Sequence, residues 1–557
     1  MLKSKPMVFL LLLALLAPMP AVASAGSQAP FHAAVVQEGE APIENLDRGD
    51  FGGGSNPQQN FNPFSPTVLS GATTWLFEPL MIINGYSCEV IPWLATEFAW
   101  PDSQTLQFTI REGVTWSDGT PFTAEDVAFT HKLGQAFPAL DTDQAWDVLT
   151  DVVAEGNTVT FTFNTPAGAQ FSNLVDNVIL PRHIWEAQAD PVTFLNEEPV
   201  GTGPFLLGSF NPQQLVMVRN PDYWQAEKVQ VQQLTYTKTE AGGQVAQLAL
   251  GEGRYDWADQ FQPGIEETYV AKDPEHNKYW FPAGGSVSLM MNHSKAPFND
   301  PAFRQGIAYA FDRESMAQRA AFGYTGGSTQ AFLTLPNQEI YLDPSIPDQG
   351  FLPHDPAKAI EILTAGGYVM DGDSLTKDGE PVNVTFSVPA SFNDWVQAAE
   401  LVREGLGEIG INVEIDSKDP DLVFDERKAG NFDMTFDAPG GGCNLWAGYN
   451  YALGGSDAPT PVDTPVDFNY IRFNSPETQA LIDQLQGATD IEAQTPIAHQ
   501  LQQMMMTQVP FIPLWYGPVW FEYRTENAEG WPSAENPYAH PGNPLVIITN
   551  LVPPAAE

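Results

Sequence analysis

Basic residues are scarce in this chain of 557 residues. It has 24 Lys and Arg against 69 Asp and Glu, so its formal net charge is −45 at pH 7. Charged residues make up only 17% of the chain, below the roughly 25% of an average globular protein. The imbalance therefore comes from missing Lys and Arg. A surface of this sign repels nucleic acid and anionic lipid, which excludes both as partners.

Recognisable catalytic and metal-binding motifs are also missing. The eight His residues are scattered without metal-ligand spacing, and there is no Gly-x-Ser-x-Gly, Cys-x-x-Cys or phosphate loop. The many Asp and Glu leave open a carboxylate pair of the kind that hydrolyses glycosides, but no acid stands in a recognisable catalytic context. We therefore expect a protein that is not an enzyme, with no catalytic residue, no metal ligand and no cofactor.

Only two cysteines are present, Cys88 and Cys443, and they lie far apart in the sequence. An oxidising compartment would permit a disulfide between them. Two separate buried thiols are the alternative, and the sequence leaves both open because the geometry decides.

Long apolar runs are absent after the N-terminus. Residues 1–25 begin with Lys3 and Lys5, continue with an apolar run over 7–16 and end in small residues. This pattern predicts a cleaved signal peptide, because the run is too short to span a bilayer. No Cys follows the run, so no lipid anchor is encoded. We expect a periplasmic or secreted protein.

The most informative stretch that is present is TLQFTIREGVTWSDGTPFTAEDVAFTHKL, over 105–133. Apolar and polar residues alternate over 105–110, which predicts a strand with one buried face. Turn-forming residues fill 117–121. Thr123 is a good N-cap for the helix that follows, whose first turn carries Glu125 and Asp126.

The order of these side chains resembles the opening block of the bacterial extracellular solute-binding proteins, family 5, which includes oligopeptide-, dipeptide- and oligosaccharide-binding proteins. Three later blocks resemble the same family in the same order. They are PVGTGPF with RNPDYW over 199–224, the segment 288–316 with Asp312-Arg313, and QVPFIPLWYG over 508–517. In the first of these, Gly201 and Gly203 predict a turn where backbone passes closely.

The resemblance implies an α/β fold of two lobes, the periplasmic-binding-protein type II fold (cluster C), with an extra α/β domain inserted in the first lobe. The boundaries that we expect are 26–70 with 196–285 and 516–557 for lobe I, 71–195 for extra domain II, and 286–515 for lobe III. Strands that alternate with helices over 351–416 predict largely parallel pairing in lobe III. Gly366-Gly367 and Gly410 predict the C-terminal ends of two of these helices. The crossings near 285 and 515 would be hinge strands.

The resemblance also places the ligand in a cleft between the lobes. Peptide binders carry a lobe III Asp that pairs with the amino terminus of the peptide, in a Trp-x-x-Asp-Tyr segment. Here PGGGC occupies that place, over 439–443, and Asp437 is the only neighbouring substitute. The ligand-binding residues that we expect are the amide at position 59 (Gln59), Phe61, Trp75, Asn444, Trp446, Tyr449 and Trp515.

Amide and aromatic side chains suit neutral, hydroxyl-rich rings. Site chemistry therefore favours a β-linked oligosaccharide such as a cello-oligosaccharide, whereas peptide is the commonest ligand of the family. Trp446 and Tyr449 as core residues under a Gly-rich loop are the alternative. We expect a monomeric solute receptor that delivers its ligand to ABC permease subunits; a secreted hydrolase of oligosaccharides and a ligand-sensing receptor for a kinase are the alternatives.

Overall fold

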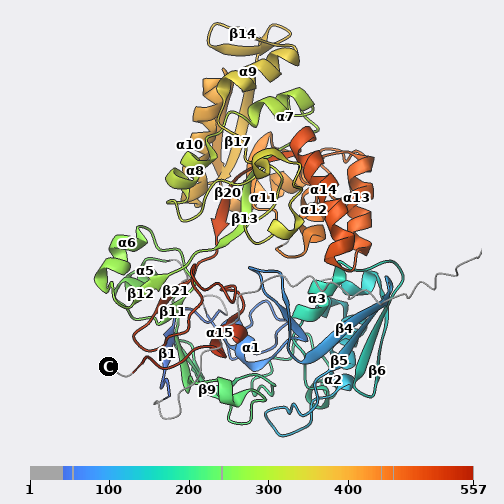
Figure 1. Ribbon diagram of the computed structural model, residues 1–557, viewed down its shortest axis with the longest axis vertical. Coiled ribbons are helices and arrows are strands. Elements are labelled where there is room, and N and C mark those ends of the chain that lie inside the picture. Colours follow the sequence, from blue (N-terminus) through green and yellow to red (C-terminus); the bar gives the residue numbers. More distant parts are fainter. Residues whose placement is uncertain are drawn as a thin grey trace, which may run out of the picture.

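The computed structural model describes residues 42–52, 56–142, 144–239, 243–440, 442–455 and 457–555. The expected signal peptide, over 1–25, lies outside these residues. Figure 1 shows a lower part with two sheets and an upper part with one large sheet, joined by β13 (Ala283–Met291) and β20 (Phe511–Pro518). In the described part of the chain, no helix has the length and hydropathy needed to cross a membrane.

The first sheet has seven strands in the order β12-β21-β11-β1-β10-β9-β8, and we call the region around it lobe I. Strand β1 pairs in parallel with β10 and β11, and the other neighbours are antiparallel. The strands are β1 (Leu46–Arg48), β8 (Phe205–Asn211), β9 (Gln214–Arg219), β10 (Gln233–Thr237), β11 (Trp257–Ala258), β12 (Asn277–Tyr279) and β21 (Glu522–Arg524). Its helices are α1 (Ser70–Leu76), α5 (Gln244–Gly251), α6 (Ile265–Thr268) and α15 (Pro544–Ile548).

The second sheet is antiparallel, with the order β4-β5-β7-β6, and we call the region around it domain II. Its elements are the hairpin β2 (Met81–Ile83) and β3 (Val90–Pro92), strands β4 (Ala95–Asp102), β5 (Thr105–Ile110), β6 (Leu149–Glu155) and β7 (Thr158–Phe163), and helices α2 (Ala124–Ala136), α3 (Gln170–Asp176) and α4 (Arg182–Trp185). In β5 every second residue is buried, as the alternation predicts. Thr123 caps α2 as expected, and the Asp126 carboxylate accepts from the Thr123 backbone N–H at 2.8 Å.

The upper part, which we call lobe III, has a five-stranded sheet in the order β18-β17-β19-β13-β20. Strand β17 pairs in parallel with β18 and β19, and β13 pairs antiparallel with β19 and β20. Beyond the crossing strands it contains β17 (Asn383–Pro389), β18 (Asn412–Lys418) and β19 (Met434–Asp437), and a small sheet of β14 (Tyr368–Asp371), β15 (Ser374–Lys377) and β16 (Glu380–Pro381). The expected parallel pairing is confirmed for β18-β17-β19, but the sheet is not largely parallel, because both pairings of the crossing strand β13 are antiparallel.

Eight helices of lobe III surround these strands in the described residues: α7 (Pro301–Ile307), α8 (Arg313–Ala320), α9 (Pro356–Ala365), α10 (Asn393–Glu408), α11 (Pro420–Ala429), α12 (Leu445–Leu453), α13 (Pro476–Gly487) and α14 (Ile491–Gln508). The glycine stops that the sequence predicts lie at helix ends. Gly366 caps α9 and is followed by Gly367 at φ 84°, and Gly410 at φ 78° follows α10. These positive φ angles are strained for residues with a side chain, so glycine ends the helices there.

One hydrophobic core runs through lobe I and domain II without a break, and lobe III has separate cores. The turn at 201–203 packs against the end of α1 and links it to domain II, because the Ser117 backbone N–H donates to the Gly201 carbonyl at 2.9 Å. A Cβ atom at Gly201 would lie 1.8 Å from the Leu76 carbonyl oxygen, and one at Gly203 would lie 2.0 Å from that of Trp75. Only glycine allows this approach of backbone to backbone, so the predicted close passage is confirmed.

The buried carboxyl group of Glu78 also joins lobe I to domain II. It accepts hydrogen bonds from Trp93 Nε1 at 2.6 Å, the Tyr223 hydroxyl at 2.8 Å and Trp224 Nε1 at 3.2 Å. Trp93 follows β3 in domain II, whereas Tyr223 and Trp224 follow β9 in lobe I. Burial raises the pKa of Glu78 to about 7, and the hydrogen bonds only partly offset that cost.

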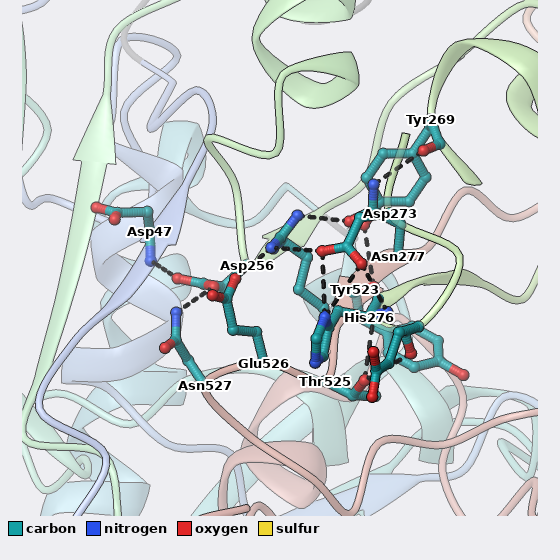
Figure 2. Close-up of polar contacts among 12 residues, drawn as sticks. Asp47, Asp256, Tyr269, Asp273, His276, Asn277, Tyr523, Thr525, Glu526 and Asn527 are labelled. Atoms are coloured by element: carbon teal, nitrogen blue, oxygen red, sulfur yellow. Dashed lines mark hydrogen bonds and ion pairs between the residues drawn. The ribbon is translucent and has the colours of Figure 1, made fainter. Parts of the chain in front are cut away.

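The C-terminal segment from β21 onward is held in lobe I by hydrogen bonds to side-chain carboxylates (Figure 2). Asp256 accepts from the Asp47 backbone N–H and from Asn527 Nδ2, both at 2.8 Å. Asp273 accepts from Arg524 at 3.1 Å and lies 3.1 Å from the His276 ring nitrogen. The acids that gather here are therefore hydrogen-bonded within the protein, and burial raises the pKa of Asp256.

Candidate functional site

The parallel strands of lobe I end at one edge, where open α/β sheets bind ligands. Two ion pairs lie there. The Arg48 guanidinium stacks on the Trp257 ring at 4.1 Å and lies 3.9 Å from an Asp259 carboxylate oxygen. Lys238 Nζ donates to Asp50 at 2.6 Å. These two cations are therefore neutralised inside lobe I.

The parallel strands of lobe III end at Pro389, Lys418 and Asp437. Asp437 receives the Arg427 guanidinium at 2.9 Å on one oxygen and the Tyr451 hydroxyl at 2.9 Å on the other. Both partners belong to lobe III, and Asp437 is 8% exposed. The negative charge of Asp437 is therefore compensated by Arg427. The positive charge of Lys418 is compensated by Glu426, whose carboxylate lies 2.8 Å away. A solute at this edge need not supply the opposite charge for either residue.

Domain II and lobe III meet along a polar seam that begins beside the crossing strands. Asn337 Nδ2 donates to the Gly85 carbonyl at 3.2 Å. Farther out, the Ala169 backbone N–H donates to the Gln486 carbonyl at 2.9 Å, which joins the start of α3 to the end of α13. Figure 1 shows α3 directly beneath α13 and α14. Hydrogen bonds rather than a shared core hold this contact.

A disulfide joins Cys88 of domain II to Cys443 of lobe III, with a Cα–Cα distance of 5.3 Å. The pairing that the sequence left open is therefore formed. Next to it, Asn444 Nδ2 donates to the Ala169 carbonyl at 3.1 Å and to Ser172 Oγ at 2.8 Å. The segment that peptide binders use for a ligand-pairing Asp is here engaged with domain II.

The expected ligand-binding residues do not come together in this structure. Gln59, Phe61 and Trp75 lie in or beside the core of lobe I and domain II, where Gln59 donates to the Glu197 carbonyl at 2.8 Å. Trp446 and Tyr449 lie on α12 over a lobe III core, and Trp515 lies on β20 in another. Four of the seven are at most 3% exposed: Phe61, Trp75, Tyr449 and Trp515.

These four buried aromatic residues pack against other protein residues in this conformation. For Tyr449 this agrees with the alternative that it is a core residue. The Tyr449 hydroxyl has no hydrogen-bond partner within the described residues, and burial raises its pKa. Asn444, Gln59 and Trp446 keep partial exposure. That these seven residues bind ligand stays a prediction.

A pocket of about 670 Å³ opens where domain II faces lobe III. Its volume falls in the roughly 300–1,000 Å³ range of small-molecule sites. Sequence reasoning found only Asn444 and the two cysteines among its walls, and it missed the aromatic side chains of β4 and α3. An aromatic at an outward position of β4 was the available signal. The lining residues are Ile83, Cys88, Val90, Phe98, Ala99, Trp100, Gly168, Ala169, Phe171, Ser172, Tyr341, Cys443, Asn444, Thr489, Asp490, Ile491, Glu492 and Gln494.

A second pocket of about 600 Å³ lies beside the crossing strands, between Phe281 and Tyr516 on one side and Arg313 and His354 on the other. Arg313 donates to the Pro513 carbonyl at 2.9 Å and is buried. It therefore supports β20, which agrees with a structural role for the Asp312-Arg313 pair. Within the described ranges, no three or more His, Cys, Asp or Glu residues are grouped to hold a metal ion.

Two lobes joined by two crossing strands, with a third domain packed on the first lobe, define the class of two-lobed solute-binding proteins. The family model for bacterial extracellular solute-binding proteins, family 5, matches residues 89–459, well over half of the chain. The chain therefore belongs to this family, and it is a solute-binding protein of the kind that serves ABC importers. The expected family and the expected fold class are both confirmed.

Individual relatives are distant. The chain is 26% identical over 402 residues to the nickel-binding periplasmic protein of Escherichia coli, covering 68% of this chain and 73% of that protein. A solved periplasmic oligopeptide-binding protein of Thermotoga maritima is 25% identical, with a TM-score of 0.80 and coverage of 91% of this chain and 99% of that one. A mannohexaose-bound structure of the same Thermotoga maritima protein is 26% identical, with a TM-score of 0.72 and coverage of 92% of this chain and 99% of that one.

Proposed function

We propose that this protein captures an extended, neutral, β-linked oligosaccharide between its lobes and presents it intact to ABC permease subunits. It would act outside the cytoplasm as a monomer, exported by the leader over 1–25. Solute binding would shift the population towards a closed form, because only a closed form lets the solute contact both lobes. Lobe I, domain II and lobe III, with the boundaries expected from the sequence, would be the moving units.

The observation that supports this proposal most is that Asp437 is already paired within the protein. It is the only acidic residue over 434–455, the segment where peptide binders place the Asp for an amino terminus. Its two oxygens are already held by Arg427 and Tyr451. Asp437 is therefore not free to pair with an amino terminus, and an ammonium buried at this segment without its carboxylate is costly, which disfavours the peptide binders' mode of recognition. The mannohexaose-bound relative supports an oligosaccharide, although the cello-oligosaccharide preference rests on the side-chain chemistry of Asn444 and Trp446 alone.

A thermal-shift comparison tests the ligand class. Cellohexaose and mannohexaose are compared with a neutral and a charged hexapeptide at equal concentrations. A solute at a hundred times its Kd stabilises the folded state by about 2.7 kcal/mol, so a bound hexasaccharide should raise Tm measurably. Stabilisation by the charged peptide and none by either sugar would overturn the proposal.

Peptide remains the second candidate, because the relatives include oligopeptide-binding and murein peptide-binding proteins. The same comparison decides it. Incubation of the protein with cellohexaose, followed by chromatography, separates a receptor from the alternative of a secreted hydrolase. A receptor returns the hexasaccharide unchanged, whereas shorter products would show turnover.

A further inference from the structure

The pocket of about 670 Å³ is built by both halves of the molecule. Strand β4 and helix α3 of domain II form one wall, and Tyr341 with the start of α14 in lobe III forms the other. A molecule that fills the pocket therefore contacts domain II and lobe III at once.

The domain II wall is aromatic. Phe98 of β4 is 39% exposed although it is large and apolar, and its ring lies 4.5 Å from that of Phe171. Trp100, two residues farther along β4, stacks on Phe163 at 5.9 Å. Its indole Nε1 is buried and has no acceptor among the described residues. This wall thus offers a ring face for packing.

The lobe III wall supplies hydrogen-bond acceptors. Asp490 caps α14 through one oxygen, which accepts from the Ala493 backbone N–H at 2.8 Å, and Glu492 is exposed in the first turn. The residues that line the two walls in the described part of the chain include no Lys, Arg or His. The two carboxylates therefore repel anionic solutes and can accept hydrogen bonds from hydroxyl groups.

We infer that this pocket binds one terminal ring of the neutral oligosaccharide, with the ring packed on Phe98 and its hydroxyl groups bonded to the start of α14. The inference rests on the proposed function and adds the place where one end of the solute is held. A sugar ring has an apolar face and a rim of hydroxyl groups, which the aromatic wall and the acceptor wall match together.

The disulfide keeps the two walls together. Cys88 and Cys443 both line the pocket, one from each wall, and the hydrogen bond from Ala169 to Gln486 crosses the same seam. The walls consequently stay paired when other contacts between the lobes break. A pre-formed site avoids part of the ordering cost of binding, so Cys88 and Cys443 are positioning residues for the solute.

Isothermal titration of the oxidised full-length protein with cellohexaose and mannohexaose tests the inference, with cellobiose and mannobiose as short probes. Phe98→Ala should weaken binding of a hexasaccharide roughly 3- to 10-fold through the lost ring packing. Phe98→Tyr should bind within about twofold of wild type because it keeps the ring. Val153→Ala, which truncates an equally exposed residue of the same sheet, should leave Kd unchanged.

The other wall and the tether have their own variants. Glu492 lies on an exposed helix turn, so Glu492→Gln should leave the fold intact. The variant should weaken binding of the hexasaccharide while the ring pair of Phe98 and Phe171 stays in place. The double variant Cys88→Ser/Cys443→Ser should raise the Kd of the hexasaccharide more than that of the disaccharide. A merely structural disulfide would change both probes equally.

The outcomes separate the inference from the proposed function. Binding of a hexasaccharide by wild type with unchanged Kd in Phe98→Ala and Glu492→Gln would overturn the inference alone. No binding of any sugar by wild type would overturn both. If wild type binds a peptide with a free amino terminus, and Glu492→Gln weakens binding of that peptide but not of a sugar, the assigned ligand class would be overturned.

Discussion

The two contacts that domain II makes are built in different ways. Towards lobe I it shares one continuous hydrophobic core, crossed by the buried Glu78 and by two glycines against backbone. Towards lobe III it makes hydrogen bonds, mainly from backbone and amide groups, and one disulfide. Burial of apolar area makes the first contact as permanent as a domain interior. The second can separate at low cost except where the covalent bond holds it.

The largest loss should follow truncation of Trp75, which lies in the core that lobe I shares with domain II. Its ring is 1% exposed, packs edge-on against Trp257 and Phe205, and donates from Nε1 to the Tyr236 hydroxyl at 2.6 Å. Trp75→Ala should lower the free energy of unfolding by about 3–5 kcal/mol, the usual cost of removing a large buried aromatic side chain. Urea denaturation followed by circular dichroism measures it, with the exposed Val245→Ala as control. A loss below 1 kcal/mol would contradict the shared core.

Removal of the disulfide should affect the separable contact without dissolving either side of it. Cys88→Ser/Cys443→Ser should lower the free energy of unfolding by about 2–4 kcal/mol, because the open chain gains conformational entropy when unfolded. Helix and strand content of the folded variant should stay that of wild type, since Cys88 and Cys443 lie outside the helices and strands. Hydrogen exchange should rise along the seam from Ala169 to Gln486 first. Unchanged exchange there would show that the hydrogen bonds alone suffice.

The pH dependence of stability should report on Glu78. Its pKa is about 7 when folded against 4.5 as the ordinary value, so the folded state holds the proton more tightly. The stability that Glu78 contributes is therefore complete below about pH 4.5 and is lost as the pH rises through about 7. The difference in unfolding free energy between wild type and Glu78→Gln should fall by about 2–3 kcal/mol between pH 4 and pH 8. A flat difference would mean that this carboxyl is not desolvated.

Asn444 offers the smallest and most selective test. Its side chain caps α12 through Oδ1 and reaches domain II through Nδ2. Asn444→Ala removes both functions and should cost about 1–2 kcal/mol, whereas Asn444→Asp keeps the cap and removes the donor. In thermal denaturation, the loss in Asn444→Asp relative to wild type measures the seam, and the further loss in Asn444→Ala measures the cap. No loss in Asn444→Asp would show that the amide contributes only as a cap.

Local patterns predicted the fold well where each residue carries its own signal. The alternation in β5, the cap at Thr123 and the glycine stops after α9 and α10 all depend on neighbouring residues only. The disulfide depends on the distance between two segments that are 355 residues apart. No local rule fixes that distance, so the sequence left two alternatives.

The candidate site was less predictable for the same reason. Aromatic residues serve as core and as ligand platform alike, and only burial separates the two roles. Tyr449 of α12 and Trp515 of β20 are buried, whereas Phe98 of β4 is exposed. Asp437 was recognisable as the nearest carboxylate, but its compensation by Arg427 arises from the packing of α11 against the sheet.

The disulfide between Cys88 and Cys443 also constrains the order in which the chain matures. Synthesis proceeds from the N-terminus, so Cys88 is made 355 residues before its partner. Domain II must remain with an unpaired thiol until the start of α12 is made and lobe III has brought Cys443 alongside. Formation of this bond therefore marks late assembly, and a chain truncated before residue 443 would leave Cys88 without its partner.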